Sequence, residues 1–79
     1  MKPSHFYNGG EHGEQYGDGP WLVDQLNQLA KPVREKVSQR YSEIYQELTL
    51  SDPRKKRFRC NTWMRKTVEK NKNMDIVPF

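Results

Sequence analysis

A helical apolar pattern fills residues 22–48, LVDQLNQLAKPVREKVSQRYSEIYQEL. Apolar side chains recur there at spacings of three and four, which places them on one side of a helix with 3.6 residues per turn. The stripe consists of Leu22, Leu26, Leu29, Val33, Val37, Tyr41, Ile44 and Leu48, and is widened by Ala30 and Tyr45. It predicts an all-α fold, either a small helical hairpin or a three-helix arrangement.

Pro32 interrupts this stripe without changing its register. A proline inside a helix removes one backbone hydrogen bond and clashes with the preceding turn, at a cost of about 3 kcal/mol, and it disfavours helical geometry in the residue before it. Either one kinked helix covers residues 20–48, or separate helices cover residues 20–30 and 33–48. We favour the break, because a short first helix can then fold across the others to complete a three-helix core.

A polar stretch after Leu48 marks the start of a third helix over residues 53–71. Ser51 or Asp52 can accept hydrogen bonds from the first free N–H groups of that helix, and Pro53 fits its first position. The short connection favours an antiparallel hairpin with the preceding helix. A helical domain is therefore predicted over residues 20–72.

The segments that flank this domain have a different composition. Residues 1–19 contain all five glycines and no aliphatic periodicity, so we expect a disordered or loosely docked tail. Order should begin where Asp18 or Gly19 caps the first helix. The C-terminal tail, residues 73–79, ends in the apolar sequence MDIVPF. It is either a strap docked on the hairpin, which we favour, or a short binding motif.

Charge is concentrated in residues 53–72, PRKKRFRCNTWMRKTVEKNK, which hold nine of the fourteen basic side chains and a single acid. At about 100° per residue, the predicted helix has two distinct sides. One side carries Cys60, Trp63, Met64, Thr67 and Val68. The other carries Arg54, Lys55, Arg59, Arg65, Lys66 and Lys70. We expect the first side to pack on the apolar stripe and the second to face solvent and bind a partner.

Phe58 projects among the cations, away from the apolar side of this helix. Two interpretations are open. The first turn can bend so that Phe58 caps the hairpin against Leu48 or Leu50, which we favour. Otherwise the ring is exposed at a binding site, where it can stack on a base or enter a pocket of a partner protein. Phe58 is therefore included among the candidate site residues.

The helix predicted over residues 33–48 carries basic side chains such as Arg34 near its N-terminal end, and Glu43 and Glu47 near its C-terminal end. The helix macrodipole favours the opposite arrangement. In an antiparallel hairpin the two glutamates would lie beside residues 54–57. We therefore expect Glu43 and Glu47 to pair with that cluster and to neutralise part of its charge.

Several classes of function find no support in the sequence. No apolar run approaches the roughly 18 residues of a membrane span, and the single cysteine, Cys60, cannot form an intrachain disulfide. Both features favour a reducing, cytoplasmic setting. His5 and His12 are too isolated to predict a metal site. No nucleophile–histidine pair or glycine-rich phosphate loop is present, so neither enzymatic activity nor a cofactor is expected.

Two classes of binding protein remain. In the first, the basic helix contacts nucleic-acid phosphates, and Phe58 and Asn61 lie near bases. In the second, the chain is an adaptor or inhibitor that covers an acidic or DNA-binding groove of a larger protein. A third possibility is a solvated basic helix without a partner.

The segments RFRCNTWMRK, residues 57–66, and VREKVSQRYSEIYQEL, residues 33–48, are similar to parts of the small basic accessory proteins of lambdoid phages and prophages. Some of those proteins end in a comparable helix of tryptophan, apolar and arginine residues. The resemblance implies a DNA-associated factor or an inhibitor of a host enzyme. It carries no catalytic or ligand-binding signature.

Overall fold

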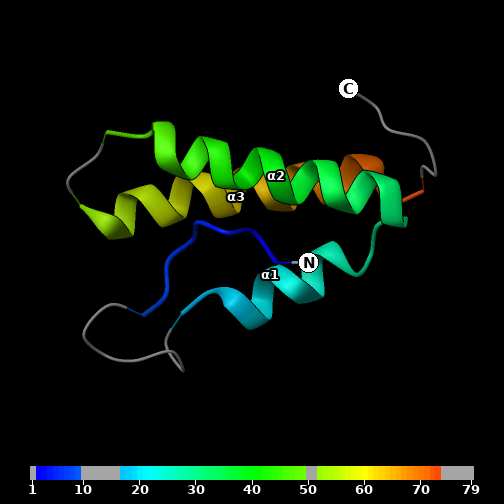
Figure 1. The fold of residues 1–79 in the computed structure, drawn as a ribbon, viewed down its shortest axis with the longest axis horizontal. Coiled ribbons are helices and arrows are strands. Elements are labelled where there is room, and N and C mark those ends of the chain that lie inside the picture. Colours follow the sequence, from blue (N-terminus) through cyan, green and yellow to red (C-terminus); the bar gives the residue numbers. More distant parts are fainter. Residues whose placement is uncertain (1, 10–16, 50–51, 74–79) are drawn as a thin grey trace.

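Three helices make up the regular structure of the described residues, which are 2–9, 17–49 and 52–73 of a computed structural model. They are α1 (Gly19–Leu26), α2 (Lys31–Glu47) and α3 (Pro53–Asn71), and no strand occurs in these ranges. The helices α2 and α3 lie side by side and antiparallel, and α1 packs against both (Figure 1). The predicted all-α fold is confirmed as a three-helix arrangement.

The chain breaks between α1 and α2, as favoured from the sequence. Pro32 occupies the first turn of α2, where its missing N–H group has no intrahelical partner to lose. The first helix ends at Leu26, several residues earlier than expected. The Arg34 guanidinium then donates hydrogen bonds to the carbonyl oxygens of Leu26 at 3.1 Å and Leu29 at 3.0 Å. Arg34 thus binds carbonyl oxygens at the end of α1 and in the segment that follows it. These contacts give a structural role to a cation that lies near the N-terminal end of α2, where the helix macrodipole disfavours positive charge.

The two other helix starts differ in how they are capped. At α3, Asp52 Oδ1 accepts a hydrogen bond from the Arg54 backbone N–H at 2.9 Å, and Pro53 takes the first helical position. This confirms the predicted cap. At α1, Asp18 occupies the capping position, but its side chain makes no capping bond. The carboxylate of Asp18 instead reaches α3.

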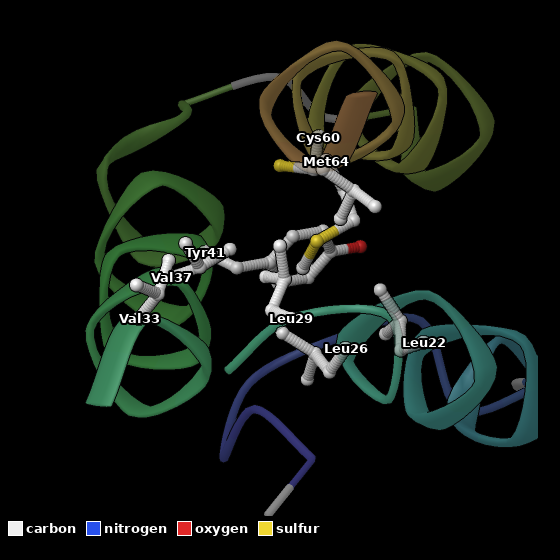
Figure 2. Packing of buried hydrophobic residues seen from close by; sticks show 9 residues of the cluster. Leu22, Leu26, Leu29, Val33, Val37, Tyr41, Cys60 and Met64 are labelled. Carbon is white, nitrogen blue, oxygen red and sulfur yellow. The ribbon is translucent and has the colours of Figure 1, made fainter. Parts of the chain in front are cut away.

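The core lies along the axis between the three helices. In Figure 2 the labelled side chains point from all three helices toward one another. The buried cluster consists of Leu22, Leu26, Leu29, Val33, Val37, Tyr41, Cys60, Met64 and Val68, with Trp63 and Ile44 packed at its edge. The apolar stripe and the apolar side of the third helix therefore meet, as predicted.

Tyr41 is completely buried at the centre of this core, and its hydroxyl donates a hydrogen bond to Asn61 Oδ1 at 2.5 Å. Burial raises the pKa of Tyr41, so the phenol remains a donor throughout the physiological range.

The substitution Tyr41→Phe leaves the Asn61 oxygen without its donor, and should lower the free energy of unfolding by about 1–2 kcal/mol. Thermal denaturation checks this, with Tyr45→Phe one turn away as the matched control. Equal losses in the two variants would contradict the assigned role of the hydroxyl.

The N-terminal residues 2–9 lie against the helices without forming regular secondary structure (Figure 1). The backbone N–H of Ser4 donates to Ser42 Oγ at 2.8 Å, and Pro3 is fully buried. Phe6 packs against the core cluster. Of the two alternatives for the tail, these residues fit the docked one. Residues 10–16 of the expected tail, like residues 74–79 of the C-terminal tail, lie outside the described residues.

Candidate functional site

The side of α3 that points away from the core collects the residues selected from the sequence. All seven are exposed: Arg54, Lys55, Phe58, Arg59, Arg65, Lys66 and Lys70. At about 100° per residue, they fall within roughly half the circumference of the helix. We call this surface, formed by the six bases and Phe58, the basic face.

Phe58 is 70% exposed, and it is the one large apolar side chain that is exposed among the described residues. The favoured expectation that Phe58 is buried as a cap of the hairpin is wrong for the contact with Leu48, and Leu50, the other expected contact, lies outside the described residues. Helix α3 is already regular from Pro53, so its first turn does not bend and the position of Phe58 is fixed by the helical period. The alternative interpretation, an exposed aromatic ring among cations, is the observed one.

The three remaining bases of residues 53–72 are used within the fold. Arg57 pairs with Asp18. The ammonium group of Lys56 lies 4.4 Å from the centre of the Tyr45 ring, in a cation–π contact. Lys72 pairs with Glu69 at 2.9 Å. Helix α3 therefore divides its cations between contacts within the protein and the basic face.

Asp18 is the centre of a polar cluster that joins the start of α1 to α3. Its carboxylate is 7% exposed and binds the Arg57 guanidinium through both oxygens, with the Nε–Oδ2 distance at 3.0 Å. Asn61 Nδ2 donates to the same Oδ2 atom at 2.9 Å. The ring of Tyr7 lies 4.2 Å from the guanidinium carbon of Arg57. The hydrogen bond from Arg57 to Asp18 raises the pKa of the arginine further, so the guanidinium stays charged.

This cluster corrects two expectations. Asn61, which the sequence suggested as a base contact, uses its amide to join Asp18 and Tyr41 within the fold. Asp18, read as a cap for the first helix, serves as the counter-ion of α3. The partners Asp18 and Arg57 are 39 residues apart, and no local pattern in the sequence connects them.

The expected pairing of Glu43 and Glu47 with residues 54–57 is also wrong. Both carboxylates lie near Arg40 of their own helix, at 3.6 Å and 3.7 Å respectively. Arg40 precedes the two glutamates by about one and two turns, so α2 supplies their counter-ion without help from α3. The basic face is consequently not neutralised by α2.

No carboxylate within residues 2–9, 17–49 and 52–73 forms an ion pair with the six bases of the basic face. The acid nearest to them in the helix, Glu69, is paired with Lys72. Six positive charges, none of them paired with a carboxylate in the described part of the chain, therefore lie along one exposed side of a single helix. Such a surface attracts a polyanion or an acidic protein surface.

Other reactive groups show structural contacts. Burial raises the pKa of the Cys60 thiol to about 11, which keeps it protonated and unreactive at neutral pH. The His5 ring contacts Ser4 Oγ at 3.2 Å and Gln46 Nε2 at 3.0 Å. In the described part of the chain, no three His, Cys, Asp or Glu side chains are grouped closely enough to hold a metal ion. None of its helices combines the length and apolar character needed to cross a membrane.

Comparison with known proteins adds no assignment. No family model, curated protein or solved structure shows significant similarity to this chain. The class that the described residues define is a small three-helix protein with a basic face that forms no ion pairs within those residues.

Proposed function

We propose that this chain is a non-enzymatic nucleic-acid-binding protein that acts in the cytoplasm and contacts phosphates through the basic face. One observation carries the proposal: six bases that form no ion pair with a carboxylate of the described residues share one side of α3 with an exposed aromatic ring. Lys and Arg side chains bind phosphate oxygens and release condensed counterions, which supplies most of the affinity in weakly specific nucleic-acid binding. The resemblance to lambdoid phage accessory proteins fits this role and an inhibitor role equally, so the choice between them rests on the basic face.

The distribution of charge favours nucleic acid over a protein groove. The six bases extend from Arg54 to Lys70, which corresponds to about 24 Å along the helix. A regularly charged polymer can neutralise charges over that whole length. In contrast, the centres of protein–protein interfaces are depleted of charged residues.

The exposure of Phe58 supports a second candidate function. A protein-binding adaptor or inhibitor could insert this ring into a pocket of a host protein and use the surrounding bases to cover an acidic or DNA-binding groove. Aromatic anchors of that kind contribute about 2 kcal/mol or more to protein interfaces. The two candidates differ in how strongly their affinities should depend on salt.

A titration of a fluorescently labelled 16-nucleotide DNA at several salt concentrations tests the proposal. Six phosphate contacts predict a slope of log K against log salt of about −4 for a single strand and −5 for a duplex. Affinity should therefore fall by roughly a thousandfold between 50 and 200 mM salt. Absence of binding at 50 mM salt, or binding with a slope near zero, would contradict nucleic-acid binding through the basic face. The adaptor or inhibitor function would then be the one to pursue.

A further inference from the structure

The basic face contains two hollows, one near each end of α3. Arg54, Lys55, Phe58 and Arg59 line the first, with a volume of about 590 Å³. The second lies between α1 and α3 and has a volume of about 570 Å³. It is lined by Gln25 from α1, by Gln28 from the segment that follows α1, and by Arg65, Lys66, Val68, Glu69 and Lys70 from α3. All six bases of the basic face therefore line one hollow or the other.

The first hollow combines an aromatic ring with three cations. Phe58 follows Arg54 by four residues and Lys55 by three, so all three side chains are neighbours on the helix surface. The adjacent Arg59 completes the lining. A nucleobase stacked on the Phe58 ring would have its flanking phosphates within reach of these bases, which is the combination found in proteins that bind single strands.

The state of the bases decides which polymer can use this ring. In a duplex, each internal base is stacked on both faces, and only its edges are open in the grooves. An unpaired base has a free face that can cover the Phe58 ring. Electrostatics alone would give the opposite preference, because duplex DNA has the higher charge density and releases more counterions per contact. The exposed ring is thus the feature that favours a single strand.

The second hollow offers different chemistry. The amides of Gln25 and Gln28 can each donate and accept hydrogen bonds, and unpaired bases present their hydrogen-bonding edges to such groups. The nearby Arg65, Lys66 and Lys70 provide cations for phosphates. The carboxylate of Glu69, which also lines this hollow, is paired with Lys72. The two amides and the three cations of α3 therefore suit a second part of the same strand.

We propose that the basic face binds single-stranded nucleic acid along α3, with one base stacked on Phe58 and the strand continuing into the hollow beside Gln25 and Gln28. This inference rests on the proposed nucleic-acid-binding function. The distance along the helix from Arg54 to Lys70 is about 24 Å, which is about seven nucleotides of a stacked strand at about 3.4 Å each. That length lies within the range of about 4–16 nucleotides known for single-strand sites.

Fluorescence anisotropy of the full chain with a labelled 16-nucleotide strand, alone and annealed to its complement, tests this inference. At 100 mM salt the single strand should bind about tenfold more tightly than the duplex. In a series of oligothymidylates, affinity should rise steeply up to about eight nucleotides and change little beyond that. Equal or tighter binding of the duplex would overturn the inference.

Substitutions at Phe58 separate stacking from charge. Phe58→Ala should lower single-strand affinity about tenfold and leave duplex affinity unchanged, since loss of one stacked base corresponds to a change of this size. Phe58→Trp should retain the preference, whereas Phe58→Leu, which keeps an apolar side chain without a π face, should lose it. Because the ring is 70% exposed, the melting temperature of each variant should match that of the unmodified chain.

The outcomes distinguish this inference from the function on which it rests. A duplex that binds tightly with the salt slope of several phosphate contacts, together with a neutral Phe58→Ala variant, would retain nucleic-acid binding and reject the single-strand site. If neither polymer binds at 50 mM salt, both proposals fail. A single-strand preference that survives Phe58→Ala would also reject the stacking role of Phe58.

Discussion

The substitution Asp18→Asn should remove a large part of the stability of this protein. It takes the negative charge from a carboxylate that is 7% exposed and leaves the Arg57 guanidinium without its counter-ion. Breaking a buried ion pair on one side costs about 3–5 kcal/mol. Because Arg57 is 34% exposed and can recover part of its hydration, we expect about 3 kcal/mol. For a chain of this size the melting temperature should then fall by about 12 °C or more.

Two controls make this prediction specific. Asp24→Asn is the same substitution at an exposed position within α1, the helix that Asp18 precedes. It should change the free energy of unfolding by less than about 0.5 kcal/mol. The double variant Asp18→Asn, Arg57→Gln should lose less than the sum of the two single variants, because replacing both partners leaves no unpaired charge. Chemical denaturation followed by circular dichroism measures all four proteins. An Asp18→Asn variant as stable as the Asp24→Asn variant would refute the central role of the cluster.

Removing three charges from the basic face should lower nucleic-acid affinity about a hundredfold at 0.1 M salt. The variant carries Arg54→Gln, Lys55→Gln and Arg59→Gln, which remove the cations around Phe58. Each phosphate contact to a single strand contributes about 0.7 to the slope of log K against log salt. Three lost contacts therefore reduce log K by about 2 at 0.1 M and flatten the slope by about 2.

A charge-matched control separates the basic face from the net charge of the chain. Lys2, Lys31 and Lys36 are exposed and lie outside α3. Their triple substitution by Gln removes the same number of charges, and should leave the salt slope unchanged with a loss of only a few fold. The measurement is the same titration over a range of salt concentrations. Equal losses in the two triple variants would mean that net charge, and not the basic face, attracts the nucleic acid.

The helical elements and the core followed from the sequence because their determinants are local. The spacing of Leu22, Leu26, Val33 and Val37 specifies a buried side for each helix, whichever way the helices pack. The early end of α1 did not follow, since Leu29 continues the apolar pattern beyond Leu26. Leu29 lies in the segment that connects α1 to α2, and its side chain is buried in the core. Its burial therefore does not require a helix.

The exposed half of α3 could also be predicted, because the helical period alone separates its bases from Cys60 and Met64. The way in which individual charges are paired could not. The partner of Arg57 is Asp18, which directly precedes α1 and is 39 residues away in the sequence. Glu43 and Glu47 have a closer cation in Arg40 of their own helix. Charge pairs depend on tertiary distances, and helical periodicity carries no information about those.

The most direct test of the central claim is to map bound nucleic acid onto the chain by NMR. Amide resonances of the ¹⁵N-labelled protein would be followed during addition of an eight-nucleotide single strand at low salt. We predict the largest shift changes in α3 between Arg54 and Lys70, with further changes at Gln25 and Gln28. Changes confined to the opposite surface of α2, around Glu35 and Gln39, or no changes at all, would contradict binding through the basic face.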